Sequence, residues 1–304
     1  MGTDGIAEIA SADFTRARGK AIISQIQNFM NADRDRLLSF NDVKDILKPK
    51  NQFYVGLQTV PIKLIIGSEG RYHDFNKYFL PKKDYMRNRW QRVDEAHLKD
   101  IILPSILLYE IGGVYFVRDG NHRVSVAKAQ NVEFIDAEVI SLTTEIIIKP
   151  SMTVDELRDA LINLEKRIFY CETFFGDLTD YWELDFSSPG RYDVIYNHIL
   201  VHKYYLNENI DYEIPFFDAL ISWFNNVYSP VIEVIKEQWL LANFPKRTES
   251  DLYVWIIKHW DFLKKKYGTY SLAKAADDFT KKYGQDRGRI WRFLALLVER
   301  IFKR

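Results

Sequence analysis

A strand that passes at once into a helix constrains the fold more than any other part of the chain. The run Tyr115–Val117 is β-prone, and it leads into the Asp119–Arg123 turn, whose sequence is Asp-Gly-Asn-His-Arg. Gly120 permits a sharp exit from the strand, and residues 124–129 have the composition of a compact helix. The pair Gly112–Gly113 before the run suits a tight hairpin turn. We therefore predict a hairpin whose second strand delivers Asp119 to the start of a helix.

The Asp119–Arg123 turn has the composition of an anion-binding site. The first backbone N–H groups of a helix have no partner within the helix, and the helix dipole favours negative charge there. Asn121, His122 and Arg123 add polar side chains at that position. Asp119 has three candidate roles: it caps the helix, holds a metal-bound phosphate, or orients His122. The structural alternative is that Asp119 is only a helix cap and Arg123 only a surface ion-pair partner.

The composition is that of an ordinary globular protein. The chain has 304 residues, 47% of them hydrophobic, which is enough for two domains with their own cores. Lysine plus arginine equals aspartate plus glutamate at 42 each, so no global basic field argues for nucleic-acid binding. The single cysteine, Cys171, excludes an intrachain disulfide and a cysteine-based zinc cluster, and we expect it to be buried in a helix. With no signal-peptide pattern and no apolar run of 18 residues, we expect a cytoplasmic protein without membrane insertion.

A second polar segment, Gly67–Asp74, follows a β-prone run that ends near Ile66. Loops after strands often carry function. In this loop, Glu69 has the chemistry of a general base and Arg71 that of a phosphate-binding group. The alternative is a solvated glycine turn whose charges have no role.

The segment 82–92 interleaves lysine and arginine with two aromatic residues, Tyr85 and Trp90. This pattern suits contact with a nucleic-acid backbone together with base stacking. A solvated helix face is the alternative, and a helix is expected over Val93–Ile102.

The order of these features resembles the ParB/sulfiredoxin superfamily. The resemblance covers roughly residues 58–142: a strand, a polar loop, a helix, a hairpin that ends in the Asp119–Arg123 turn, a helix and a closing strand. In ParB domains the corresponding turn is Gly-Glu-Arg-Arg and binds CTP beside DNA-binding helices, whereas in sulfiredoxins it carries a cysteine nucleophile and binds ATP. A sulfiredoxin reaction is excluded because the turn lacks cysteine. No clear helix-turn-helix follows that would support ParB partitioning.

The turn is more similar to the Asp-Gly-His-His-Arg turn of the free serine kinases on the same fold. Asn121 replaces the first histidine of that turn. The resemblance implies that Glu69, after the first strand, acts as a base, and that Asp119 and His122 take part in catalysis. It also implies that the turn handles the phosphates of a nucleotide (ATP, ADP or CTP) and Mg²⁺, with the metal at Asp119. Gly120, Asn121, Arg123, Arg71 and Ser68 are then the nucleotide-binding residues.

The C-terminal half is expected to be mainly helical. Thr153 and Glu156 form a capping-box pattern for a helix through about Phe169. The aromatic residues at helical spacing are expected in a core, and they are Trp182, Phe186, Tyr192, Tyr196, Tyr204, Tyr205, Phe216, Phe217, Trp223, Phe224, Trp239, Trp255 and Trp260.

Three further patterns in this half leave alternatives open. His198 and His202 share a helix face as a metal pair would, but lack an acidic residue that completes a zinc-protease pattern. Thr248 and Asp251 predict another helix start. Lys246 and Arg247 beside it bind a phosphate or meet the first domain, or the pattern reflects helix capping alone. Residues 287–304 form a basic amphipathic segment that touches a membrane or partner, or packs as a final helix.

Together these patterns predict an α+β protein of three parts: an N-terminal helical brace (1–52), a ParB/sulfiredoxin-like nucleotide-binding domain (53–150) and a helical domain (151–304). The boundary after residue 150 follows the β-prone run Ile146–Ile148. The first functional hypothesis is a Mg²⁺-dependent phosphotransferase or nucleotide hydrolase, with a small hydroxyl-bearing molecule or water as acceptor. The alternative is a non-catalytic regulator that binds DNA or a protein through residues 82–92.

Overall fold

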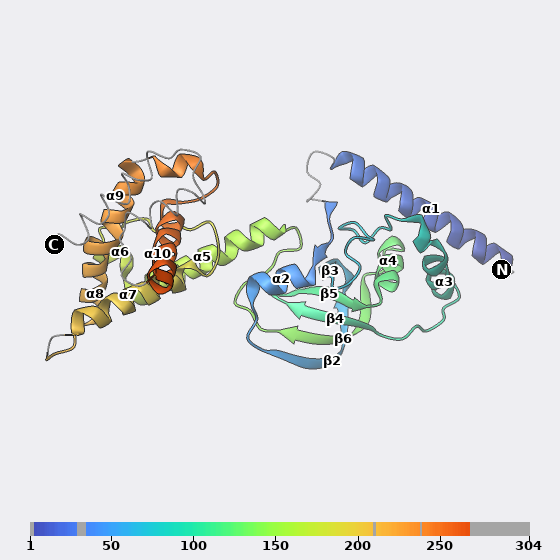
Figure 1. Cartoon of the computed structure of the whole chain (residues 1–304). Coiled ribbons are helices and arrows are strands. Elements are labelled where there is room, and N and C mark those ends of the chain that lie inside the picture. The colour runs from blue at the N-terminus through green and yellow to red at the C-terminus, as the bar shows by residue number, and fades with distance from the viewer. Residues whose placement is uncertain (1–2, 29–34, 209–210, 238, 268–304) are drawn as a thin grey trace. The chain divides into compact units, whose positions relative to one another are not determined.

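The hairpin expected before the Asp119–Arg123 turn belongs to a six-stranded mixed sheet. The computed structural model describes residues 3–28, 35–208, 211–237 and 239–267, and it divides into two units, Met1–Ala160 and Leu161–Arg304. The first unit holds all the strands that the structure describes, together with helices, and is α+β; the described part of the second is helical (Figure 1). The N-terminal helices therefore share a unit with the sheet, and the division falls within a helix.

The elements of the first unit follow the predicted order. They are α1 (Thr3–Gln27), β1 (Leu38–Ser39), α2 (Phe40–Leu47), β2 (Gln52–Pro61), the 3₁₀ turn η2 (Ile62–Leu64), β3 (Ile65–Ser68), η3 (Asp84–Met86), α3 (Arg87–Leu98), β4 (Ile106–Ile111), β5 (Val114–Asp119), α4 (Asn121–Ala129), β6 (Phe134–Leu142) and the start of α5 (Val154–Thr173). The strand expected at Ile146–Ile148 is wrong: this segment is irregular, and its Ile148 N–H donates to the Gly112 carbonyl at 2.9 Å.

The strand order in the sheet is β1-β3-β5-β4-β6-β2. Strands β1, β3 and β5 are parallel, β4 pairs with β5 as the predicted antiparallel hairpin, and β4 and β6 are parallel. The edge strand β2 is antiparallel to β6, with a bulge between Tyr54 and Gly56, and its Phe53, Tyr54, Val55 and Leu57 side chains are exposed. The two parallel strands β3 and β5 therefore end side by side at the same edge of the sheet.

Helices cover the two faces of this sheet differently. On one face Phe40 of α2 stacks on Tyr109, with ring centroids 4.2 Å apart, and also contacts Phe116. The opposite face carries Leu108 and Val117, which belong to the core that includes residues of α3 and α4. Figure 1 shows α3 and α4 next to each other, with α1 against α3.

Helix α1 begins earlier than the sequence predicts, and its buried side agrees with the prediction only in part. The pattern predicts a helix from about Asp13 to Met30 with Ala21, Ile22, Ile26 and Phe29 on its apolar side. Ala21 is buried as predicted, Ile22 and Ile26 are exposed, and Phe29 lies outside the described residues. Phe14 and Ala17 complete the buried side, and Phe14 meets Trp90 edge to face at 5.6 Å. Small alanines at this spacing let α1 approach α3 closely.

The second unit is built from the rest of α5 and from further helices. These are α6 (Phe175–Leu178), α7 (Arg191–Asn207), α8 (Phe216–Trp223), the π-helical turn η4 (Phe224–Tyr228), α9 (Ser229–Glu237), the 3₁₀ turn η5 (Leu240–Asn243) and α10 (Glu249–Tyr267). Both predicted helix starts are confirmed: the Glu156 N–H donates to Thr153 Oγ1 at 3.2 Å, and the Asp251 N–H donates to Thr248 Oγ1 at 3.1 Å.

The expectations about burial in this unit are right only in part. Trp223, Tyr192 and Phe186 lie in its core, but Tyr204, Tyr205 and Trp239 are exposed, with Tyr196 and Phe217. The expected burial of Cys171 is wrong, since it is exposed together with Phe174, whereas Phe169 and Phe175 are buried.

Two of the predicted features lie outside what the structure describes. They are the segment 287–304 and the side chain of Trp260. Within the described chain, no helix is long and apolar enough to cross a membrane.

A buried carboxylate joins α1, α3 and α4. Asp94 is fully buried, and its Oδ1 accepts a hydrogen bond from Gln130 Nε2 at 2.8 Å. The same amide nitrogen donates to Asp13 Oδ2 at 3.0 Å. Asp94 Oδ2 has no hydrogen-bond partner among the described residues. Burial raises the pKa of Asp94, and Gln130 partly opposes this.

Replacing Asp94 with asparagine should stabilise the protein at neutral pH. Because the native pKa lies above the ordinary 3.8, the stability from this group is complete below that pH and is lost as the pH rises through the native pKa. An asparagine keeps an acceptor for Gln130 and carries no charge. We expect Tm to rise by about 2–4 °C at pH 7, measured by thermal unfolding between pH 4 and 8.

The matched control is Glu95→Gln, the neighbouring carboxylate, which pairs with Lys99 on the helix surface. It should change Tm little. A decrease in Tm for Asp94→Asn at pH 7 would contradict the view that the charged form of buried Asp94 destabilises the protein.

Candidate functional site

The second residue of the Asp119–Arg123 turn is a glycine, Gly120, that no other residue can replace without strain. Gly120 has φ +102° and ψ 20°, a conformation that side chains rarely adopt. A Cβ atom there would also overlap the Ile106 side chain. Gly120 is the N-cap of α4, and the helix has no side-chain cap. Of the three candidate roles of Asp119, helix capping is therefore excluded, because the N-cap position falls on the next residue.

Asp119 and Arg123 form an ion pair with each other. Arg123 Nη2 lies 2.7 Å from Asp119 Oδ2, and Arg123 Nη1 donates to the carbonyl oxygens of Pro104 and of Ser105, the latter at 3.1 Å. The guanidinium thus ties the turn to the start of β4. These three contacts use three of the five N–H donors of the guanidinium, so Nε and one N–H of Nη2 remain for a ligand.

The two polar segments predicted from the sequence lie next to each other. The Glu69 N–H donates to the Val117 carbonyl at 2.9 Å, which continues the parallel pairing of β3 with β5. Ser68 Oγ donates to the same carbonyl at 3.2 Å and accepts from the Arg71 N–H at 3.3 Å. Ser68 is fully buried, so it shapes the loop and does not face a ligand.

The carboxylates of Glu69 and Asp119 face different neighbours. Successive side chains of a strand point to opposite faces of the sheet. Arg118 lies over the Tyr109 ring at 5.7 Å, so Asp119, next along β5, turns to the face of α4. Burial, followed by the Glu69 charge, raises the pKa of Tyr109, whereas Arg118 lowers it. Glu69 therefore belongs to the face that α2 covers.

The first turn of α4 carries two buried polar side chains. Asn121 and His122 are 8% and 6% exposed. Asn121 Oδ1 and His122 Nδ1 have no hydrogen-bond partner among the described residues. The His122 ring packs edge to face on Phe75 at 5.7 Å.

Positive charge surrounds this start of α4. Burial lowers the pKa of His122 to about 4, and the charges of Arg89 and Arg71 act in the same direction, whereas Asp74 opposes them. His122 is therefore neutral at physiological pH, and two arginines lie close enough to influence it.

Arg71 is held by its own loop. It pairs with Asp74 at 3.2 Å, and the Tyr85 hydroxyl donates to the other oxygen of Asp74. Bonding to Asp74 raises the pKa of Tyr85. This network places Arg71 beside α4 while its side chain stays partly exposed.

A magnesium site made only by protein side chains is not present among the described residues, where no group of three or more histidine, cysteine, aspartate or glutamate side chains is placed to hold a metal. Magnesium commonly binds through one or two carboxylates together with substrate phosphates and water. Asp119, which is exposed on most of its side chain, fits that type of site.

Trp90 cannot stack on a base in the way that the nucleic-acid interpretation of residues 82–92 requires. Its ring is fully buried, and Nε1 donates to Ser125 Oγ at 2.9 Å. Arg87 is also engaged, with its guanidinium 4.5 Å above the Phe14 ring. The sequence pattern was ambiguous because an aromatic residue among cations at helical spacing also marks the buried side of a surface helix.

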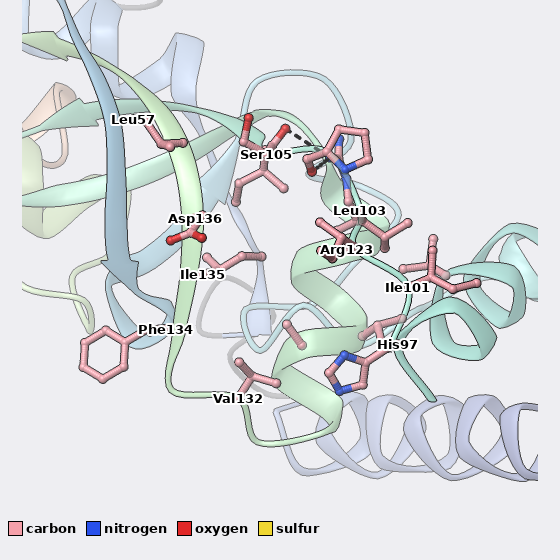
Figure 2. Close-up of a pocket in the computed structure, with 16 residues that line it drawn as sticks. Leu57, His97, Ile101, Leu103, Ser105, Arg123, Val132, Phe134, Ile135 and Asp136 are labelled. Carbon is pink, nitrogen blue, oxygen red and sulfur yellow. Dashed lines mark hydrogen bonds between the residues drawn. The ribbon is translucent and has the colours of Figure 1, made fainter. Parts of the chain in front are cut away.

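Sequence reasoning missed an apolar groove on the other side of Arg123. The groove encloses about 580 Å³, and Figure 2 shows Arg123, Leu103 and His97 along one wall with Ile135 and Asp136 opposite. Ile102, on its rim, is 96% exposed. The apolar run Ile101–Leu103 was the sequence signal for this groove. The helix predicted over Val93–Ile102 includes its first two residues, but the helix ends at Leu98.

The candidate residues of the second unit have structural partners. His202 Nε2 lies 3.0 Å from Ser222 Oγ, and the His198 ring packs against Tyr253 at 5.7 Å. Arg247 Nη1 donates to the hydroxyl oxygens of Ser187 and Ser188, each at 3.0 Å.

Comparisons of the chain with protein-family models, with curated proteins and with solved structures find no match. The geometry of the Asp119–Arg123 turn and its resemblance to nucleotide-binding turns are therefore the observations that bear on function.

Acid should destabilise the protein through His122. An unfolded histidine binds a proton below its ordinary pKa of 6.5, but native His122 does so only near pH 4. Stability from this group is therefore present above pH 6.5 and is lost as the pH falls from 6.5 to 4. In His122→Gln the drop in Tm across this range should shrink by several degrees, as measured by thermal unfolding at fixed ionic strength.

The exposed His97 provides the control, since His97→Gln should leave the acid-induced drop unchanged. An equal drop in wild type and His122→Gln would show that His122 is already protonated or does not matter.

Proposed function

We propose that the first unit is a ParB/sulfiredoxin-like domain that binds the phosphates of a nucleoside di- or triphosphate at the start of α4. One observation carries the proposal: α4 starts without a side-chain cap, and Arg71 and Arg89 lie near enough to depress the pKa of its buried His122. Unpaired backbone N–H groups and cations at a helix start favour a phosphate over other ligands. The resemblance of the turn to nucleotide-binding turns supports the same ligand.

The binding role divides among several groups. The N–H groups of the first turn of α4 bind one phosphate, and Arg71 and Arg89 neutralise its charge. Gly120 gives the backbone the positive φ that directs the chain into α4 and lets it pack on Ile106. Asp119 would hold Mg²⁺ against the phosphates through Oδ1, because Arg123 binds only Oδ2 of this carboxylate.

We further propose that Glu69 is the base of a phosphoryl transfer. Its backbone pairs with the strand that leads into the turn, so it lies at the same sheet edge as the phosphate site. Glu69 removes the proton from an acceptor hydroxyl or water as the new O–P bond forms. The bond to the leaving nucleotide breaks, and its oxygen keeps the electron pair. The charge that develops on the phosphoryl oxygens is stabilised by Arg71 and the helix N–H groups.

The alternative is a regulator that binds DNA through residues 82–92. One observation favours it: Lys83, Arg89 and Arg92 are exposed on neighbouring parts of η3 and α3. The burial of Trp90 removes one of the two aromatic residues that such a surface would use for stacking, and the exposed Tyr85 is bonded to Asp74 through its hydroxyl. Arg89 then serves either function, and the salt dependence of binding to DNA distinguishes them.

The binding proposal predicts a graded loss of affinity. Nucleotides should raise Tm of the full chain, because a ligand that binds only the native state stabilises it. ATP, ADP and CTP are each screened with and without Mg²⁺. Arg71→Gln and Arg89→Gln should each weaken the best nucleotide by about tenfold, the loss of one charged hydrogen bond.

Arg92→Gln is the matched control, since Arg92 is also exposed on α3 but is not among the charges that act on His122. An equal loss for all three variants would indicate diffuse attraction to a basic surface. No stabilisation by any nucleotide would exclude the site.

The catalytic proposal makes a separate prediction. Glu69→Gln should keep nucleotide affinity but lower phosphoryl transfer or hydrolysis at least about 100-fold, the usual contribution of a positioned base. Asp119→Asn should weaken the Mg²⁺ dependence of binding. Turnover is measured as release of inorganic phosphate, or of the nucleoside di- or monophosphate that remains after transfer of one phosphoryl group. Unchanged turnover in Glu69→Gln would reject this residue as the base while leaving the binding proposal intact.

A further inference from the structure

Helix α7 of the second unit has an apolar face that the described elements cover only at its edge, where Tyr196 packs on Phe216 of α8 with ring centroids 5.1 Å apart. Its inner side is buried through Tyr192, Ile195 and Ile199. On the opposite side, Val201 and Tyr204 are 55% and 67% exposed. Tyr196, Leu200 and Tyr205 extend this exposed face along the helix. Side chains four residues apart lie above one another on a helix, so the set forms a continuous surface, here called the α7 outer face.

An exposed apolar surface of this length normally marks a binding site for another part of a protein. The α7 outer face extends from Tyr196 to Tyr205, about 15 Å, on a helix of 17 residues. The helix also carries two exposed carboxylates, Asp193 in its first turn and Glu208 at its C-terminal end. The occupant of the outer face should therefore be elongated, apolar on one side and basic on its flanks.

The same chain contains a segment of that description. Residues 287–304 include Trp291, Leu294, Leu297 and Ile301, which recur at helical spacing, between arginines and lysines. Its 18 residues would make a helix of about 27 Å, close to the length of α7. The linker after Tyr267 is long enough for the segment to reach any part of the unit, because 19 extended residues span up to about 65 Å.

Charge supports the same pairing. Residues 161–258 of the second unit contain 8 lysine and arginine residues against 15 aspartate and glutamate residues. Residues 287–304 contain 6 lysine and arginine residues against 1 glutamate. The acidic body therefore attracts the basic segment, and attraction within one chain benefits from a high effective concentration.

We propose that residues 287–304 pack as an amphipathic helix along the α7 outer face of the same molecule. This commits the basic C-terminal segment to an internal partner, and not to a membrane, a second copy or DNA. The apolar side of the segment covers Val201 and Tyr204, and its cations approach Asp193 and Glu208. The proposal is independent of the nucleotide site, which belongs to the other unit.

Thiol cross-linking in the full-length protein tests this arrangement. Cys171, the only native cysteine, is first replaced with serine. Val201→Cys and Leu294→Cys are then combined. Both positions lie near the middle of their segments, so they can meet whether the two run parallel or antiparallel. A short thiol–thiol cross-linker should join them within one chain, seen as a monomer of altered mobility on a denaturing gel and as a linked peptide pair by mass spectrometry.

The matched control places the first cysteine at Tyr181, which is exposed in the same unit but outside α7. Tyr181→Cys with Leu294→Cys should cross-link at least tenfold more slowly than the α7 pair. Equal rates for the two pairs would overturn the proposal, because they would show a segment without a fixed partner. A cross-linked dimer would overturn it in favour of a second copy, and the absence of any cross-link would show that the segment lies elsewhere.

A second measurement tests the role of charge. Asp193→Asn together with Glu208→Gln should slow the α7 cross-link by about two- to fivefold at low salt, as expected for exposed ion pairs, and high salt should reduce this difference. These replacements are on the surface and are not expected to affect folding. An unchanged rate would show that the carboxylates do not contact the segment.

Discussion

The site depends above all on the parallel pairing of β3 with β5. The hydrogen bond from the Glu69 N–H to the Val117 carbonyl extends this pairing beyond the last residue of β3. It brings together two polar segments that are about fifty residues apart in sequence. Gly67 makes the approach possible, because a side chain there would collide with the Phe116 ring and with the carbonyl of Leu38. Without this register, Glu69 and the start of α4 would belong to separate surfaces.

The same register also separates the charged groups. Alternation along β5 sends Arg118 toward Tyr109 and Asp119 toward Arg123. The sheet edge therefore has a carboxylate, Glu69, on the α2 side and a cationic helix start on the α4 side. A ligand that engages both must reach around the ends of the strands. This geometry suits a phosphate at α4 with its acceptor beyond the edge of the sheet.

Local chemistry in the sequence was enough to place the elements around the site. Gly112 and Gly113 marked the hairpin, Gly120 marked the exit from β5, and the Thr153–Glu156 capping box marked the start of α5. The errors have a common cause, which is that burial is decided by distant parts of the chain. Trp90 is buried because α1 lies over it and Ser125 accepts its N–H. Neither partner could be inferred from the basic residues beside Trp90. The pairing of Arg123 with the carbonyls before β4 likewise depends on the loop conformation.

The edge strand β2 has a consequence for the order in which the chain acquires its structure. Gln52 pairs with Leu142 and Pro61 with Phe134, so β2 leaves the ribosome long before β6 exists. During that interval an uncharged strand with exposed Phe53, Tyr54 and Leu57 must stay apart from its copies on neighbouring ribosomes. The bulge at Gly56, with φ +98°, belongs to the pairing with β6 and forms only with it. Before that pairing, Gly56 itself weakens the strand, because a glycine has no side chain to pack and loses more conformational freedom when it is ordered.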